Sequence, residues 1–225
     1  MKIPPPIHRW SMSYKAAIRL QQRLASQVRF ERLRGPIRYV GGVDLAFSTD
    51  GQRCLAGVIV YDVSSGEVVE QRLACRPVQF PYIPGLLSFR EAPAALAAIR
   101  KLKIEPDVFM FDGQGFAHPR RLGLASHAGL LVDRPTIGCA KSRLCGRHDE
   151  APNKKGLFAP LTDRGETIGA VLRTRVNVKP VYVSVGHRVT LDEAVELVTR
   201  CATRYRLPEP TRLAHLYVTE HRTET

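Results

Sequence analysis

The stretch at residues 106–115, Pro-Asp-Val-Phe-Met-Phe-Asp-Gly-Gln-Gly, constrains the fold of this chain more than any other. Residues 108–111 are a short, wholly apolar run behind a proline, the pattern of a strand buried on both faces. The run stops at Asp112. Open α/β sheets bind ligands at the carboxyl ends of such strands, and glycines allow a large ligand to approach the backbone. Asp112 is therefore either a site residue or the start of an ordinary Asp-Gly turn.

A second acid lies inside a predicted strand. Residues 38–48 alternate in polarity, which places Asp44 between Gly42 and Ala46 on one face of the strand. An acid is poorly suited to a strand interior. Its small neighbours indicate space for something bound, although an exposed face of an edge strand would also account for the acid.

The remaining periodicity predicts helices and strands in an order that defines the fold class. Helices are expected at 11–28, from 88 to about 102, at 122–132, at 191–203 and after residue 210; strands are expected at 38–48, 54–63, 67–75, 108–111, 136–140, 168–172 and 181–185. The first three strands form an antiparallel meander. A right-handed crossover then makes the fourth strand parallel to the first. If the two strands are neighbours, Asp44 and Asp112 lie side by side.

Three antiparallel strands followed by alternating helices and strands is the order of the ribonuclease H-like fold. This is an α/β fold with a mixed central sheet flanked by helices. No repeat, low-complexity tract or linker interrupts the sequence, so we expect a single domain over residues 1–225. Residues 143–156 are polar and basic, and they predict a loop that contacts phosphates or is simply solvated.

Two segments match the capping box S/T-x-x-E at a helix start. Thr190 and Glu193 precede the helix at 191–203. Ser88 and Glu91 precede the helix that runs to about residue 102. On local evidence, a cap explains Glu91 better than catalysis does.

A stiff loop connects the meander to this helix. Pro81 and Pro84 hold Tyr82 and Ile83 between them as a presented pair. Rigid aromatic tips of this kind suit insertion between bases. The alternative is a loop aromatic packed back on the core.

The charge balance points to a polyanionic partner. The chain has 34 Lys and Arg against 21 Asp and Glu, a net charge of +13. This favours nucleic acid over an acidic membrane surface, with a generally basic protein as the alternative. The five cysteines include no CxxC pair, which is typical of reduced thiols and indicates a cytoplasmic protein. No apolar run reaches about 18 residues, so we expect no membrane span.

The ribonuclease H-like fold supports two-metal hydrolysis, in which carboxylates on adjacent strands hold Mg²⁺ ions that activate water. Asp44, Glu91 and Asp112 can supply the charge, because Mg²⁺ prefers a few carboxylates completed by water and phosphate. His215 in the last helix can complete the metal shell or position a water. Lys141 follows the strand at 136–140 and can stabilise charge that develops on the phosphate. Acids weaken binding of a polyanion unless a metal neutralises them, so their presence favours catalysis over simple binding.

Several strings resemble the endonuclease V family. They are Val43-Asp-Leu-Ala-Phe47, Phe80-Pro-Tyr-Ile-Pro-Gly-Leu-Leu-Ser-Phe-Arg-Glu91, Asp112-Gly-Gln-Gly-Phe-Ala-His118-Pro-Arg, Gly138-Cys-Ala-Lys141-Ser, Lys179-Pro-Val-Tyr-Val-Ser-Val-Gly-His187 and Pro210-Thr-Arg-Leu-Ala-His215. The resemblance covers about residues 12–218. It implies a DNA repair endonuclease for deaminated bases, chiefly hypoxanthine (deoxyinosine). Such an enzyme nicks the lesion strand at the second phosphodiester bond on the 3′ side, leaving 3′-hydroxyl and 5′-phosphate ends, with Mg²⁺ or Mn²⁺ as cofactor. Its partner would be double- or single-stranded DNA with deaminated bases, and we expect a monomer.

The resemblance also implies roles for individual residues. The metal site would consist of Asp44, Glu91, Asp112 and His215. Phosphate-contacting or catalytic roles would fall to Lys141 and His118. From its position beside Glu91, Arg90 is an ion-pair partner of that acid, a phosphate contact or neither. The wedge that separates the strands would be Pro81, Tyr82, Ile83 and Pro84, and the pocket for the flipped base would lie near Gly85, Leu87, Gly115 and Ala140. Packing or capping roles suit His127 and His187.

Two other functions stay open at this point. A ribonuclease H-like nuclease for inosine-containing RNA or branched DNA would share the acids without requiring the Pro-Tyr-Ile-Pro segment. In a non-catalytic nucleic-acid-binding protein, the three acids would be superfluous. The sequence does not separate a DNA preference from an RNA preference.

Overall fold

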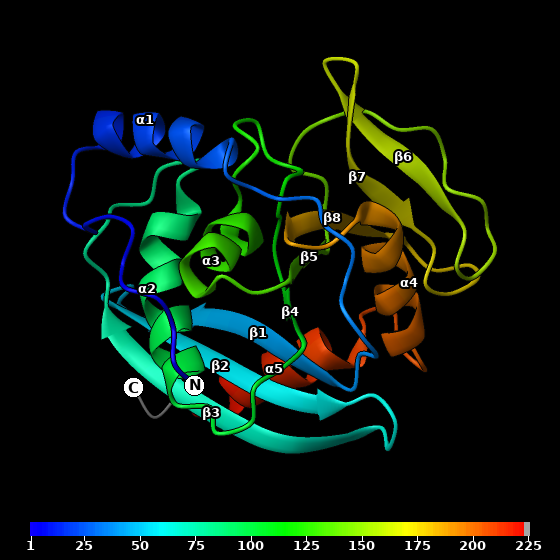
Figure 1. Ribbon diagram of the computed structural model, residues 1–225, viewed down its shortest axis with the longest axis horizontal. Helices are drawn as coiled ribbons and strands as arrows, with labels where there is room; N and C mark the ends of the chain where they lie inside the picture. Colours follow the sequence, from blue (N-terminus) through cyan, green and yellow to red (C-terminus); the bar gives the residue numbers. More distant parts are fainter. Residues whose placement is uncertain (223–225) are drawn as a thin grey trace.

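The computed structural model describes residues 1–222, which form one eight-stranded sheet with five helices around it (Figure 1). The strands are β1 (Tyr39–Phe47), β2 (Arg53–Asp62), β3 (Glu67–Pro77), β4 (Val108–Phe111), β5 (Thr136–Ala140), β6 (Phe158–Asp163), β7 (Glu166–Leu172) and β8 (Val181–His187). The helices are α1 (Tyr14–Ala25), α2 (Leu87–Arg100), α3 (Leu124–Val132), α4 (Leu191–Cys201) and α5 (Glu209–His221). Across the sheet the order is β3-β2-β1-β4-β5-β8-β7-β6. Residues 223–225, the end of the domain expected from the sequence, lie outside the described residues.

The centre of the sheet confirms the predicted topology. β1 and β2 pair antiparallel, as do β2 and β3, whereas β4 lies beside β1 and parallel to it. The backbone N–H of Asp112 donates to the carbonyl oxygen of Val43 at 3.0 Å. The acid that follows β4 is therefore next to Asp44 in β1. β5 continues the parallel part on the other side of β4, so Lys141 comes at the same edge of the sheet.

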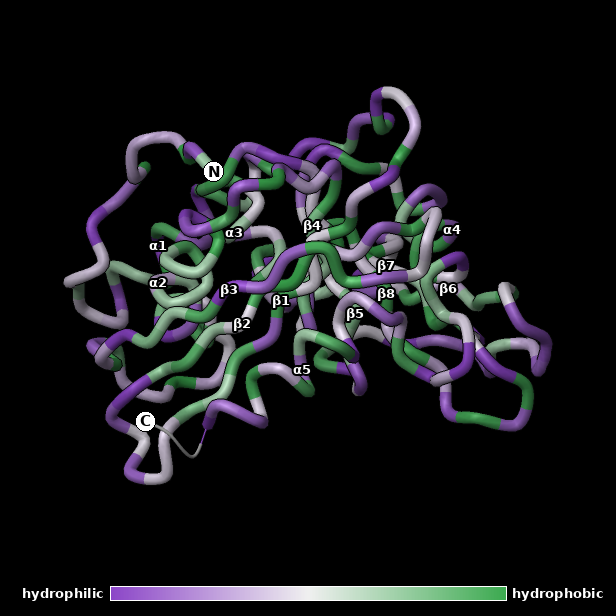
Figure 2. The backbone as a smooth tube through the Cα atoms, turned by 90° about the horizontal axis from the view of Figure 1, so that it is seen from below, coloured by the Kyte–Doolittle hydropathy of each residue, from purple (hydrophilic) through white to green (hydrophobic). Residues whose placement is uncertain are grey.

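Helices cover both faces of this central region. α2 and α3 pack on the face that Val43 and Phe111 occupy. α5 packs on the opposite face, where Ile59 and Tyr61 meet Ala214. Figure 2 shows the strands between α2 and α3 on one side and α5 on the other. Because α5 carries His215, its packing decides where that side chain lies relative to Asp44.

The small residues beside Asp44 have a structural cause that the sequence analysis missed. They were expected to leave space for something bound, but at Gly42 the chain itself fills that space. A Cβ at Gly42 would lie 2.0 Å from the carbonyl oxygen of Pro210. The backbone of α5 thus rests directly on β1 at this glycine. This close approach brings His215, further along the same helix, toward the carboxyl end of β1.

One strand, β6, was not predicted from the sequence. β6 is an edge strand whose partner in residues 1–222 is β7. It contains Pro160, which interrupts a strand pattern in the sequence but is tolerated at an edge because no neighbour needs its missing N–H. The capping box before α4 is confirmed, since the Thr190 side chain accepts from the backbone N–H of Glu193 and the Glu193 carboxylate accepts in return.

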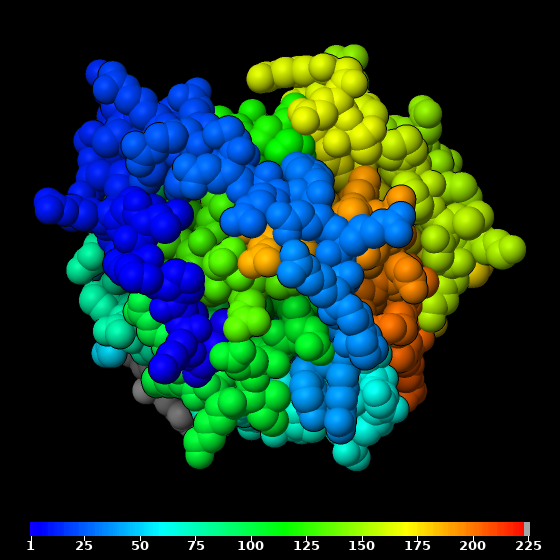
Figure 3. Space-filling model, viewed as in Figure 1, coloured from blue at the N-terminus to red at the C-terminus, as the bar shows by residue number. Residues whose placement is uncertain are grey.

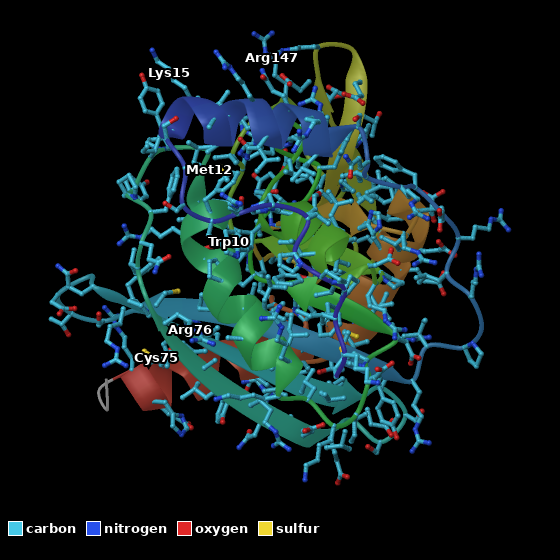
Figure 4. All side chains as sticks on the ribbon, turned by 60° about the vertical axis from the view of Figure 1, so that its left-hand side comes forward. Trp10, Met12, Lys15, Cys75, Arg76 and Arg147 are labelled. Atoms are coloured by element: carbon cyan, nitrogen blue, oxygen red, sulfur yellow. The ribbon has the colours of Figure 1, made fainter. Side chains whose placement is uncertain are left out.

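Residues 1–12 cross the outer side of the α2–α3 pair before α1 begins. In Figure 3 this N-terminal segment, in dark blue, runs over the green surface of the helices. Figure 4 shows Trp10 lying beside α2, and the Trp10 ring centroid is 5.7 Å from that of His127 in α3. None of the helices within residues 1–222 has the length and hydropathy of a membrane span.

Candidate active site

Three side chains from distant parts of the chain meet at the carboxyl ends of β1 and β4. Asp44 comes from β1, Asp112 directly follows β4, and His215 comes from α5. One ligand atom from each of them lies within 4.8 Å of those of the other two. His215 Nδ1 is 2.7 Å from Asp44 Oδ2. The predicted convergence of Asp44 and Asp112 is therefore confirmed.

Glu91 of α2 adds a third carboxylate to this region. Its side chain is buried. Burial, and after it the charges of Asp44 and Asp112, raise the pKa of Glu91 to about 8. Burial and then the charge of Asp112 also raise the pKa of Asp44, against the hydrogen bond with His215. Negative charge is thus concentrated where little water can screen it.

The same segment corrects the predicted capping box at Ser88. α2 begins at Leu87, with Leu86 as its N-cap, and within the described chain this end has no side-chain cap. Ser88 lies inside the helix, and its hydroxyl contacts His127 Nδ1 of α3 at 2.9 Å. The Glu91 carboxylate is consequently available to the acidic site.

This donor set fits a divalent cation. Lys141 forms an ion pair with Asp112, and His215 contacts Asp44. Within residues 1–222 no group donates a hydrogen bond to the Glu91 carboxylate, and the pKa of Glu91 is raised. A cation with affinity for carboxylates would relieve the crowding among the acids. Carboxylate oxygens suit Mg²⁺, and Mn²⁺ accepts an imidazole nitrogen as well.

A cavity of about 350 Å³ opens beside the acids. Asp44, Glu91 and Asp112 form one part of its wall, and the loop from Tyr82 to Leu87 forms another. Of the four residues predicted for a base pocket, Gly85 and Leu87 line this cavity, whereas Gly115 and Ala140 are not among its lining residues in the described chain. A Cβ at Gly115 would lie 2.2 Å from the carbonyl oxygen of Val185, so this glycine is required for packing against β8.

The loop over the cavity is firmly held at both ends and exposed at its tip. Phe80 and Leu86 are buried, whereas Tyr82 is 71% exposed. The carbonyl oxygen of Gly85 accepts from Arg120 at 2.7 Å and from Gln21 at 3.0 Å. The aromatic tip is therefore presented to solvent on a fixed base, which excludes the alternative that Tyr82 packs back on the core.

Two predicted phosphate contacts lie in structural positions. His118 is buried in the cavity wall, where its Nδ1 accepts from the backbone N–H of Arg120 at 3.1 Å. Burial lowers the pKa of His118 to about 4, so the ring is neutral. Arg90 lies over the Phe47 ring and donates to the carbonyl oxygens of Phe80 and Gly51. Both side chains support the loop and the cavity from within the protein.

Comparison with known proteins identifies the chain. The sequence model of the endonuclease V family matches residues 20–216. The chain belongs to the endonuclease V family. Endonuclease V of Trichormus variabilis is 53% identical over 215 residues, which are 95% of this chain and 97% of that protein. The family resemblance stated from the sequence is confirmed, and the chain is a nuclease, a phosphodiester hydrolase of DNA repair.

Solved structures of other endonuclease V proteins share the fold. The one from Streptomyces avermitilis has a TM-score of 0.91 and 39% identity, covering 96% of this chain and 95% of that one. The one from Ciona intestinalis, in complex with a 24mer DNA containing an inosine followed by a ribo-adenosine, has a TM-score of 0.78 and 25% identity, covering 92% and 96%. The ribonuclease H-like arrangement predicted for this chain is thus shown.

Sequence reasoning missed several polar residues of the site. Gln21 and Arg120 carry no local signal, because their role at Gly85 arises from contact between distant segments. Gln114, by contrast, lies in the Asp-Gly-Gln-Gly string, so the sequence motif could have indicated it as a site residue. Its Nε2 donates to the carbonyl oxygen of Ser142, but Oε1 is buried without a hydrogen-bond partner among residues 1–222. A bound group with a donor would remove the cost of that unpaired acceptor.

Proposed function

We propose that this nuclease cleaves DNA strands that carry a deaminated base, chiefly hypoxanthine, with Mg²⁺ as cofactor and Mn²⁺ as a substitute. The observation that carries the proposal is the cavity, which has the acids in one wall and a stiff, exposed aromatic loop beside it. The complex of a relative with inosine-containing DNA supports the choice of lesion. The finer part of the proposal is cleavage at the second phosphodiester bond 3′ to the lesion, leaving 3′-hydroxyl and 5′-phosphate ends.

The side chains around the acids have distinct tasks in this reaction. Asp44, Glu91, Asp112 and His215 would hold the metal ions, which supply an activated water and stabilise charge on the phosphate. Lys141 lies beside Asp112, so its ammonium can contact the scissile phosphate and stabilise the negative charge that develops there. We assign the phosphate contact to Lys141 in preference to His118 and Arg90, because those two side chains are already engaged in the loop and the cavity wall.

The loop and the cavity select the damaged nucleotide. Pro81, Tyr82, Ile83 and Pro84 form a rigid tip that enters the base stack and takes the place of the extruded base. The base itself enters the cavity near Gly85 and Leu87, where groups of the wall contact its Watson–Crick edge. A lesion that pairs weakly leaves the stack at lower cost than an intact base, which adds to the selectivity.

Matched oligonucleotides test the proposal. DNA and RNA strands, single and duplex, carry hypoxanthine, uracil or no lesion at one position, and cleavage is measured with Mg²⁺, with Mn²⁺ and with a chelator. The expected result is metal-dependent nicking of hypoxanthine DNA at one position 3′ to the lesion. A preference for the RNA strand would favour the alternative of an inosine-specific ribonuclease, which the ribo-adenosine in the relative's substrate makes worth testing. Absence of lesion-dependent cleavage on every strand would refute the proposal.

Replacing Tyr82 with alanine should reduce lesion recognition. Base–aromatic stacking contributes about 1–3 kcal/mol, so the ratio of affinities for hypoxanthine and intact duplexes should fall roughly tenfold. Salt-dependent binding to intact DNA should change little, because it depends on basic side chains. Binding is measured over a range of salt concentrations. Tyr82→Phe is the matched control, since it keeps the ring and should keep the ratio. Equal losses on both duplexes would argue against a wedge.

A further inference from the structure

A chain of hydrogen bonds runs from the N-terminal segment to the cavity. His8 Nε2 is 2.8 Å from His127 Nε2, and His127 Nδ1 is 2.9 Å from Ser88 Oγ. His127 in α3 is fully buried, and Ser88 in α2 lines the cavity. His8 lies in the segment that crosses these helices (Figure 3). A residue near the start of the chain thus contacts the cavity wall through one buried ring.

The backbone partner of His8 determines which atoms donate in this series of hydrogen bonds. His8 Nδ1 is 2.8 Å from the carbonyl oxygen of Arg9, which can only accept, so Nδ1 carries the proton. Burial lowers the pKa of His8, and burial lowers the pKa of His127 to about 3. Both rings are neutral, and a neutral imidazole has one donor and one acceptor nitrogen.

The remaining protons follow in order. Nε2 of His8 is an acceptor, so Nε2–H of His127 donates to it. Nδ1 of His127 is then an acceptor, and the Ser88 hydroxyl donates its hydrogen to it. The Ser88 oxygen can therefore only accept a hydrogen bond from any other partner. The groups packed around His8 preserve this state: the rings of Trp10 and Phe89 lie against it, and the positive charge of Arg23 disfavours its protonation.

We propose that the His8–His127–Ser88 chain makes Ser88 a specificity-determining acceptor that recognises a ring N–H produced by deamination. The inference rests on the proposed function. Adenine has a bare N1, whereas hypoxanthine has N1–H; cytosine has a bare N3, whereas uracil has N3–H. An oxygen that can only accept a hydrogen bond is complementary to the ring N–H of the deaminated base. Against the undamaged base, the same oxygen faces the lone pair of the bare ring nitrogen, which is unfavourable. Guanine and xanthine both have N1–H, so this device does not separate them.

His8 acts as a positioning residue, since it acts on the base through two other side chains. Replacing it with alanine leaves the His127 ring free to exchange tautomers, and Ser88 can then donate or accept. Replacing it with glutamate supplies a group that only accepts, and His127 keeps its orientation. Replacing it with lysine supplies a group that only donates, which forces His127 to donate to Ser88 and frees the hydroxyl hydrogen for the cavity.

The test measures competition for cleavage of a labelled hypoxanthine strand by unlabelled strands that differ in one base. For the unmodified chain, hypoxanthine should compete better than adenine. Ser88→Ala and His8→Ala should each lower this ratio roughly threefold to tenfold, the effect of one hydrogen bond. His8→Glu should retain the ratio, and His8→Lys should lower it at least as far as alanine does. The xanthine-to-guanine ratio is the internal control and should stay constant in all variants.

Each outcome is decisive. An unchanged hypoxanthine-to-adenine ratio in Ser88→Ala, or equal ratios in the His8→Glu and His8→Lys variants, overturns the inference. A parallel change in the xanthine-to-guanine ratio also overturns it, because that would indicate a general distortion of the cavity. If the unmodified chain cleaves no lesion strand, the proposed function itself fails. Melting temperatures of the variants show whether each is folded, and the glutamate–lysine pair compares two long charged side chains at one position.

Discussion

Replacing Asp112 with asparagine should lower the rate of cleavage of a hypoxanthine strand by at least about a thousandfold, because metal ions contribute several kcal/mol to the stabilisation of the transition state. The change removes the charge from one of the two carboxylates that share the site with His215. Substrate binding should stay within about tenfold of the unmodified chain, since basic side chains and the loop supply most of it. Single-turnover cleavage and equilibrium binding measure the two effects separately.

The matched control for this variant is Asp192→Asn on α4. It makes the same chemical change in the first turn of α4, a helix that packs on β7 and β8 and supplies none of the acids of the site. Cleavage by the control should remain close to that of the unmodified chain. Asp112→Asn should also stabilise the metal-free protein or leave it unchanged, because the charge of Asp112 opposes ionisation of Asp44 and Glu91. Retained cleavage in Asp112→Asn would remove this residue from the metal site.

The convergence of the acids was predictable because it depends on local patterns and one topological rule. The apolar run before Asp112 identifies β4, and alternation identifies β1. β1, β2 and β3 alternate in direction, and the crossover from β3 through α2 then makes β4 parallel to β1. The structure places them side by side, with Val43 opposite Phe111. Strand periodicity and the crossover predict that the two strands are parallel, and the structure supplies the remaining condition, that they are neighbours.

The features that sequence reasoning missed depend on contacts between distant segments. Ser88 satisfies a local capping pattern, yet its hydroxyl contacts His127 in α3. Gly115 suggests room for a ligand, yet the space beside it is taken by the backbone at Val185. Pro160 conceals β6, because a proline excludes a central strand but not an edge strand. In each case the local pattern permits two structures, and tertiary packing selects one of them.

The roles of individual site residues are a separate matter from their placement. The structure brings Asp44, Asp112 and His215 together and places Glu91 and Lys141 beside them. These positions agree with the roles that the family resemblance implies. The link from His8 through His127 to Ser88 joins three segments that are distant in sequence, so no local pattern indicates it.

Glu91 should make the stability of the metal-free protein fall as pH rises. The pKa of its carboxyl is about 8 in the folded chain, compared with an ordinary value of 4.5. Between these two pH values, the folded state keeps a proton that the unfolded state has lost. The contribution of this group to the free energy of unfolding is fully present below the unfolded pKa and is lost as the pH rises to the folded pKa. Buried histidines with lowered pKa have the opposite effect only below their ordinary value of 6.5. The window from pH 6.5 to 8 isolates the carboxyl.

Across that window the free energy of unfolding should decrease by roughly 2 kcal/mol, which corresponds to a fall in Tm of about 4–8 °C. Glu91→Gln should flatten the dependence and raise the Tm of the metal-free protein at pH 8, because the amide carries no charge to be buried.

Mg²⁺ should raise the Tm of the unmodified chain more at pH 8 than at pH 6.5, because binding to a carboxylate site is favoured when the site has lost its protons. The variant should lose most of that difference. Thermal unfolding of both proteins, with and without Mg²⁺ at the two pH values, measures these Tm differences. If the Tm of Glu91→Gln falls with pH as steeply as that of the unmodified chain, another group causes the pH dependence. If the effect of Mg²⁺ on Tm is also unchanged in the variant, the cation does not neutralise the carboxyl of Glu91.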